Sequence, residues 1–210
     1  MLVSCDPQQV LPSGQSLALL DGYLAAAIDL HRQVKHALWN LEEPGASALS
    51  KPLDNVATSL DYCCDLIVAH AALLGGAVNG TVQVVAARSF LSHYPLGRAD
   101  ALAHAGAVIE AMETLAGSVR TAATRAAGWH DPDTAALLIE IARCIERHVW
   151  LVGSAAATVQ DRLPRSGSMA AILAEGGGTG HPTNRWSDRQ SASPAAAYGH
   201  DRGAAREVRP

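Results

Sequence analysis

The sequence is poor in aromatic residues, in charge and in long apolar runs, and each shortage excludes a class of protein. Aromatic residues make up 4% of the 210 residues although 49% are hydrophobic, whereas a β-sandwich needs more Tyr, Phe, Val and Thr. Charged residues make up 17% and the formal net charge is -4, so the overall composition does not indicate a nucleic-acid binder. No uninterrupted apolar run reaches the roughly 18–20 residues that span a bilayer. The abundant alanine instead favours closely packed helices.

The four cysteines show no paired metal-binding spacing. Two of them, Cys63 and Cys64, are adjacent, and neighbours on a helix point too far apart for an easy disulfide. This usage favours the reducing cytosol. The N-terminus has neither a basic start nor an apolar run, and Asp6 and Pro7 would interrupt a signal peptide. We therefore predict a soluble, cytoplasmic protein with no membrane partner.

Apolar residues recur near the 3.6-residue helical period in four long segments. These segments cover residues 16–40, 50–74, 100–127 and 131–160. The second is expected to begin at Ser50, a natural N-cap, with Pro52 in its first turn. Asp131 supplies a capping group for the fourth. Short connections join the first segment to the second and the third to the fourth, which predicts antiparallel neighbours.

The remaining segments define the domain limits. The connection between the second and third segments is long and has a helical pattern over residues 82–89, and a crossover of this kind is typical of ferritin-like bundles. From residue 161 onward the periodicity ends in a Gly-, Pro- and Ser-containing stretch, which indicates a disordered tail. We predict an all-α, ferritin-like four-helix bundle with a short crossover helix over residues 16–160. A short arm over residues 1–15 precedes it, and a flexible C-terminal tail over residues 161–210 follows it.

Two segments carry a family resemblance. The first is Lys35-His36-Ala37-Leu38-Trp39-Asn40, which is similar to the Lys-Gln-Ala-His-Trp-Asn that closes the first helix of Dps mini-ferritins. The second is the crossover, in which Leu-Gly-Gly at 74–76, Gly-Thr-Val-Gln-Val-Val-Ala-Ala-Arg-Ser at 80–89 and Tyr-Pro-Leu at 94–96 resemble the Dps crossover. The resemblance covers roughly residues 15–160.

The resemblance implies a function as well as a fold. Dps proteins are hollow homo-dodecamers with two-fold dimer interfaces. They oxidise Fe(II), typically with hydrogen peroxide, store the ferric mineral, and often coat DNA during starvation or oxidative stress. Their di-iron site spans the two-fold interface, with two His and an Asp from one chain and an Asp and a Glu from the other.

Three of these five implied iron ligands are replaced in this sequence. The two His positions are Leu38 and Ser50, and the Glu position is Ala69, whereas the two Asp are retained as Asp54 and Asp65. Leu and Ala offer no lone pair and Ser is a poor neutral ligand, whereas iron oxidation needs imidazole and carboxylate donors together. Even the loss of a residue that only orients a ligand commonly costs about 10–100-fold in metal affinity. We therefore predict an impaired ferroxidase site.

Other residues offer alternatives near this site. His70 and Cys64 are possible substitute ligands, although His70 points about 100° away from its neighbour Ala69. His31 shares a helical face with Leu38 but lies roughly 10 Å further up the helix. One helical stripe of carboxylates is either a metal-binding face or a solvated interface face that is salt-bridged to Arg or Lys. This stripe consists of Asp54, Asp61 and Asp65.

Two further residue types have structural interpretations. Trp39, next to the first ligand position, is expected to pack in the core rather than to take part in redox chemistry. Cys63 and Cys64 are expected to be small apolar fillers of the bundle. The sequence contains no Glu-x-x-His pair, so the di-iron arrangement of larger ferritins is absent.

DNA contact is predicted to come from the tail. Residues 1–160 contain 9 basic and 15 acidic residues, whereas residues 161–210 contain 7 arginines and 5 acidic residues. Each arginine could meet a phosphate, and the tails of one cage would act together, without reading sequence. The alternative is that the arginines only keep the extension soluble. The tail arginines are Arg162, Arg165, Arg185, Arg189, Arg202, Arg206 and Arg209.

Two functions remain open at this point. In the first, the chain is a Dps-like cage subunit that binds and sequesters iron, retains weak or relocated ferroxidase activity and protects DNA. In the second, the cage is not catalytic and binds or compacts DNA through its tails. Both predict a cytoplasmic homo-dodecamer, which would associate with the nucleoid where DNA binding holds.

Overall fold

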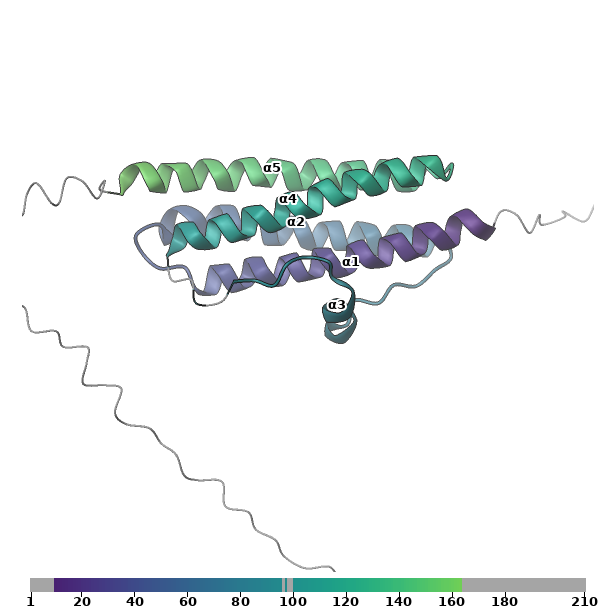
Figure 1. The fold of residues 1–210 in the computed structure, drawn as a ribbon, viewed down its shortest axis with the longest axis horizontal. Helices are drawn as coiled ribbons and strands as arrows, with labels where there is room; N and C mark the ends of the chain where they lie inside the picture. The colour runs from purple at the N-terminus through teal and green to yellow at the C-terminus, as the bar shows by residue number, and fades with distance from the viewer. Residues whose placement is uncertain (1–9, 96, 98–99, 164–210) are drawn as a thin grey trace, which may run out of the picture. The chain divides into compact units, whose positions relative to one another are not determined.

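The computed structural model describes residues 10–95, 97 and 100–163, which form five α-helices. They are α1 (Val10–Trp39), α2 (Ala46–Leu73), α3 (Val82–Arg88), α4 (Ala101–Gly128) and α5 (Pro132–Arg162). The described residues contain no strand. The four long helices lie side by side, and the short α3 projects beside α1 in the crossover between α2 and α4 (Figure 1). The predicted all-α bundle with a crossover helix is confirmed.

One hydrophobic core fills the space between the four long helices. Leu30 of α1, Leu53 of α2, Met112 of α4 and Leu138 of α5 are all fully buried, and each such side chain contributes about 1.5–3 kcal/mol through burial. Much of the rest of the core is alanine. Because alanine is the best helix former and adds little bulk, it favours long helices that pack closely.

α2 begins four residues earlier than the sequence suggests. The helix starts at Ala46, and the preceding Gly45 has a φ of 124°, a left-handed conformation that favours glycine. The Glu43 carboxylate accepts hydrogen bonds from the backbone N–H groups of Gly45 at 2.8 Å and Ser47 at 3.0 Å. The prediction that Ser50 caps this helix is therefore wrong, because Glu43 already satisfies two of the first amides.

Two other helix boundaries and the position of Pro52 differ from the predicted ones. α1 begins at Val10, so residues 10–15, predicted to belong to an N-terminal arm, are helical. Pro52 lies inside α2 rather than in its first turn, where its missing N–H leaves one carbonyl without a helical donor. α5 continues to Arg162. The predicted tail from residue 164 onward lies outside the described residues.

Of the described helices, α2 alone is long and apolar enough to cross a membrane by composition, with a mean hydropathy of 1.3 over its most apolar 18 residues. Its buried residues, including Leu53, Leu60 and Ile67, recur at helical spacing and form part of the bundle core. Asp61 and Asp65 lie on the exposed side. The arrangement is that of an amphipathic bundle helix, although only 33% of its most apolar window is buried within the subunit.

A polar network joins the start of α5 to α1 and α2. Asp131 accepts hydrogen bonds from the Thr134 backbone N–H at 3.0 Å and from the fully buried Ser16 hydroxyl at 2.5 Å. The Thr134 hydroxyl also shares a hydrogen bond of 2.8 Å with Nε2 of His70. Burial alone would raise the pKa of Asp131, but the hydrogen bonds from Ser16 and Thr134 outweigh it and hold the pKa below its usual value. The network therefore keeps a carboxylate at the junction of three helices.

We expect Asp131→Ala to lower the free energy of unfolding by about 2–4 kcal/mol. Loss of the helix cap costs about 1 kcal/mol, and the buried Ser16 hydroxyl left without a partner costs roughly 1–3 kcal/mol more. Urea unfolding at pH 7 and at fixed subunit concentration measures the loss. Asp131→Asn is the matched control, because asparagine also caps helices and should lose less.

The difference between wild type and Asp131→Ala should depend on pH in a defined direction. Because folding lowers the pKa of Asp131 from its ordinary 3.8, the contribution of the carboxylate is present above the unfolded pKa. It is lost as the pH falls through the folded pKa. An alanine variant as stable as wild type at pH 7 would contradict the assigned role of this network.

Candidate functional site

The predicted ligand positions lie on α1 and α2, which pack against each other. His31, Lys35 and Leu38 recur along α1 at spacings of four and three residues, so they lie on one side of the helix. Asp54 and Asp61 of α2 face this row, because each forms an ion pair or close contact with one of its residues. The site is therefore a seam between two helices rather than an enclosed cavity.

Asp54 lies between two lysine ammonium groups. One carboxylate oxygen is 4.0 Å from Nζ of Lys35 on α1, and the other is 3.7 Å from Nζ of Lys51, one turn earlier on α2. These are the only two lysines in the 210 residues. Because the Asp54 side chain is 51% exposed, each pair contributes about 0.2–1 kcal/mol to stability. Their larger effect is on the site, because both carboxylate oxygens already face positive charge.

Asp61 contacts His31 of α1, with 3.4 Å between Oδ1 and Nε2. Burial lowers the pKa of His31 below its ordinary 6.5, and the carboxylate of Asp61 opposes this while Arg32 and Lys35 add to it. At pH 7 His31 is therefore neutral, the form in which imidazole binds metals. The pair brings together one imidazole and one carboxylate, and Lys35 lies on the same face.

The remaining predicted positions do not converge within one subunit. Leu38 is partly buried and packs against the core, whereas Ser50, Asp65 and Ala69 are exposed along α2. Among the described residues, no group of three or more His, Cys, Asp or Glu lies close enough to hold a metal ion. Metal binding by Asp54 and Asp65 remains a prediction that depends on donors from a second subunit.

The two possible substitute ligands have other contacts. His70 shares its hydrogen bond with Thr134 of α5. Burial, together with the carboxylates of Asp61 and Asp65, raises the pKa of Cys64 to about 12, so this thiol stays protonated at neutral pH. Since a metal ion binds the thiolate, neither environment favours a replacement ligand.

The prediction that Trp39 packs in the core is wrong for the subunit, because its side chain is 71% exposed at the end of α1. Tyr62 and Leu73 of α2 are also exposed, at 57% and 84%. These three side chains are spread along the two helices, because Trp39 lies near the start of α2 and Leu73 at its end. Cys63, in contrast, is 2% exposed, as expected for a core filler.

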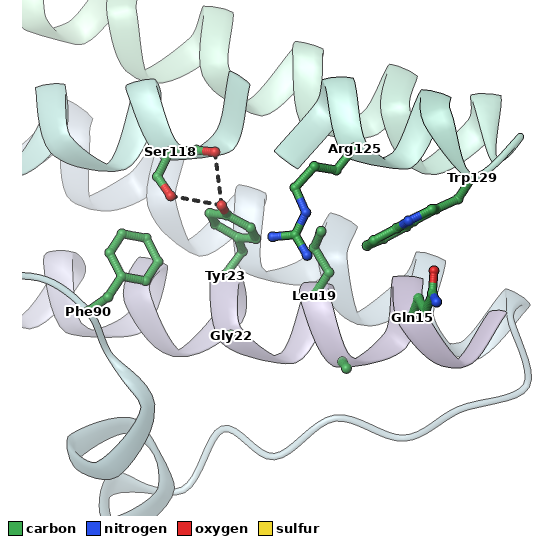
Figure 2. A pocket seen from close by; sticks show the side chains of 9 residues that line it. Gln15, Leu19, Gly22, Tyr23, Phe90, Ser118, Arg125 and Trp129 are labelled. Carbon is green, nitrogen blue, oxygen red and sulfur yellow. Dashed lines mark hydrogen bonds between the residues drawn. The ribbon is translucent and has the colours of Figure 1, made fainter. Parts of the chain in front are cut away.

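A groove of about 490 Å³ lies elsewhere, between α1, α4 and the segment after α3 (Figure 2). The Tyr23 hydroxyl hydrogen-bonds the backbone carbonyl of Ser118 at 2.9 Å and its side chain at 2.8 Å. The Arg125 guanidinium lies 5.2 Å from the centre of the Trp129 ring, and Phe90 meets Tyr23 edge-on. Among the described residues, those that line the groove carry no carboxylate, imidazole or thiol. Sequence reasoning missed this groove because its residues come from separate segments without a shared motif.

The predicted DNA contacts fall almost wholly beyond the described residues. Arg162 is the last residue of α5 and is exposed. The other six arginines, which lie outside the described residues, are Arg165, Arg185, Arg189, Arg202, Arg206 and Arg209.

Comparison with known proteins places this geometry in context. A family model of the ferritin-like domain matches residues 17–160. The DNA protection during starvation protein of Agrobacterium fabrum is 31% identical over 136 residues, which cover 65% of this chain and 84% of that protein. The structure of DpsA14 from Streptomyces coelicolor is 31% identical with a TM-score of 0.63, and the match covers 74% of this chain and 88% of that one. A point mutant of Mycobacterium smegmatis Dps1, 21% identical, has the same fold with a TM-score of 0.65 over 71% of this chain and 98% of that one.

We expect Asp61→Asn to lower the pKa of His31 further. The carboxylate of Asp61 is the contact that raises this pKa, and its loss leaves burial and two nearby cations to act unopposed. Deuterium exchange at the imidazole C2 position, read by mass spectrometry across pH, measures the shift. Asp65→Asn is the matched control and should leave the pKa of His31 unchanged. An unchanged or raised value in Asp61→Asn would contradict the assigned contact.

Proposed function

This chain belongs to the Dps family of ferritin-like proteins, and from that premise we propose that it is a cage subunit with an impaired ferroxidase centre. The cage sequesters iron and protects DNA during starvation or oxidative stress. It is a cytoplasmic homo-dodecamer that associates with the nucleoid through its C-terminal tails. Fe(II) is its cargo rather than a resident cofactor.

The environment of Asp54 carries the proposal of impairment. Three of the five ligand positions, Leu38, Ser50 and Ala69, offer no effective donor, and the retained Asp54 faces Lys35 and Lys51. Lys35 stands where the family motif itself has lysine, so the three replaced donors, together with Lys51 beside Asp54, carry the argument. The residues at the family's iron-ligand positions therefore fit a salt-bridged surface better than a catalytic metal site.

Exposed apolar side chains along α1 and α2 also support a two-fold interface on these helices. Trp39, Tyr62 and Leu73 expose large apolar surface in the single subunit, and such surface is usually covered by another chain. The lysines and aspartates lie on the same two helices. Assembly through this face would bury the aromatic residues and leave the ion pairs at the seam, in agreement with the interpretation of the aspartate stripe as an interface.

Iron storage needs clustered carboxylates on an inner surface, and α4 and α5 provide candidates. Glu110 and Glu113 of α4 and Glu140 of α5 are exposed. Glu146 of α5 is instead paired with Arg120 of α4, which lowers the pKa of this carboxyl and keeps it charged. If Glu110, Glu113 and Glu140 line the cavity, mineral can nucleate there without a working oxidation centre.

We expect wild-type protein to oxidise Fe(II) no faster than a protein-free control, with either dioxygen or hydrogen peroxide as oxidant. The triple variant Leu38→His, Ser50→His, Ala69→Glu restores the missing donors and should oxidise Fe(II) clearly faster. Adding Lys35→Gln and Lys51→Gln to that triple variant should accelerate oxidation again, because the repulsion at Asp54 is removed. The ferric absorbance band follows all three reactions.

Each variant must first be checked for assembly by analytical ultracentrifugation, since the changed residues lie on the proposed two-fold face. Oxidation by the wild type well above the control would overturn the impaired centre. A triple variant that assembles but stays inactive, with or without the lysines, would contradict the assignment of these positions.

The alternative function, a non-catalytic cage that holds DNA through its tails, is favoured by the excess of arginine after residue 160. We expect full-length protein to retard plasmid DNA in a gel, and less so as salt rises from about 50 to 200 mM, because phosphate contacts release counterions. A chain that ends at Leu163 should not retard it. The matched control is a full-length variant in which the six arginines beyond residue 164 are changed to glutamine. Equal retardation by the shortened chain would exclude the tail as the DNA contact.

A further inference from the structure

The interior between α2 and α5 contains a cluster of nucleophilic side chains that the proposed function does not use. Cys63 and Ser59 of α2 and Cys144 and His148 of α5 line one small cavity. Its volume is about 10 Å³, close to the space that one water molecule needs. The cavity thus places two thiols, a hydroxyl and an imidazole around one small space.

His148 is fixed beside Cys144. The two residues are one helical turn apart on α5, so their side chains share a face. His148 is only 8% exposed, and its Nε2 hydrogen-bonds the Ser59 hydroxyl at 2.7 Å. Its Nδ1 is buried without a hydrogen-bond partner among the described residues. His148 also interacts with the Cys144 side chain, so its imidazole lies next to that thiol.

The two thiols differ in exposure, and the neighbours of one of them lower its pKa. A hydrogen bond from the Cys63 thiol lowers the pKa of Cys144, and His148 lowers it further. Cys144 is only partly buried, whereas Cys63 is 2% exposed. The pair thus combines an accessible thiolate with a buried thiol beside it, the arrangement of an attacking and a resolving cysteine.

We propose that Cys63 and Cys144 are a redox-active pair that hydrogen peroxide oxidises to a disulfide between α2 and α5. The Cys144 thiolate attacks one peroxide oxygen, the O–O bond breaks, and Cys144 becomes a sulfenic acid. The departing hydroxide takes up the proton that Cys144 had released and leaves as water. His148 is the adjacent group that carries this proton.

The second step closes the bond. The Cys63 sulfur attacks the Cys144 sulfur, the S–O bond breaks, and the hydroxyl group leaves with the Cys63 proton as a second water. Two thiols together lose two electrons, and one peroxide gains them to become two waters. Thiol exchange with a cytosolic reductant restores the pair. This chemistry consumes peroxide without any metal ion.

The test uses full-length protein with a metal chelator present, in a Cys5→Ser background so that the N-terminal cysteine does not contribute. Stoichiometric hydrogen peroxide is added, free thiols are alkylated, and intact and peptide masses are measured. We expect a mass loss of about 2 Da per subunit before alkylation, a peptide pair linked through Cys63 and Cys144, and full reversal by dithiothreitol. Cys64→Ser is the matched control, since its thiol is adjacent but protonated, and should behave like wild type.

Two variants separate the roles of the cysteines. Cys144→Ser should abolish peroxide consumption, whereas Cys63→Ser should stop at a sulfenic acid on Cys144 that dimedone traps. Cys63→Ala serves as a second variant if the serine disturbs the core. Peroxide that oxidises no thiol in the wild type, or a disulfide that forms through Cys64 instead, would overturn the proposal.

The role of His148 has its own readout. Because the imidazole lowers the pKa of Cys144, His148→Asn should move the pH profile of peroxide consumption to higher pH while leaving the final disulfide unchanged. An unshifted pH profile would remove His148 from the proposed chemistry.

Discussion

The burial of one hydrophobic core between four long helices is the constraint on which the rest of the subunit depends. Because Leu53, Leu60 and Ile67 turn α2 toward the core, the rotation of about 100° per residue decides where every other side chain of that helix lies. Cys63 falls inside the bundle, Cys64 at its edge, and Asp65 outside. A thiol within the core and a carboxylate stripe on the surface are thus two consequences of how α2 packs.

The sequence predicts the helices better than their ends, for a physical reason. Hydrophobic period reflects core packing, which is summed over many residues, whereas a helix start depends on a few local hydrogen bonds that compete. Ser50 and Pro52 are residue types typical of a helix start. The helix nevertheless begins at Ala46, where the Glu43 carboxylate accepts hydrogen bonds from the Gly45 and Ser47 amides. Trp39 misleads in another way, because the sequence pattern does not distinguish a large apolar residue at an exposed helix end from one that fills a core.

The candidate site was predictable only to the extent that its contacts are local. The family resemblance locates the replaced positions, and the three-residue spacing of Lys51 and Asp54 can be read from the chain. The approach of Lys35 to Asp54 cannot, because it depends on how α1 and α2 pack. Cys144 and His148 are likewise one turn apart in sequence, whereas Cys63 joins them only through the contact between α2 and α5.

On the proposed function, electrostatics favour an ion-paired face over a metal site at Asp54. Solvent screens these half-exposed charges, but both carboxylate oxygens still face a lysine ammonium group. The same ammonium groups attract carboxylates, which suits a contact between subunits. A cage without a working ferroxidase centre does not consume hydrogen peroxide through iron oxidation. On the proposed chemistry, the Cys63–Cys144 pair removes hydrogen peroxide by two-electron steps.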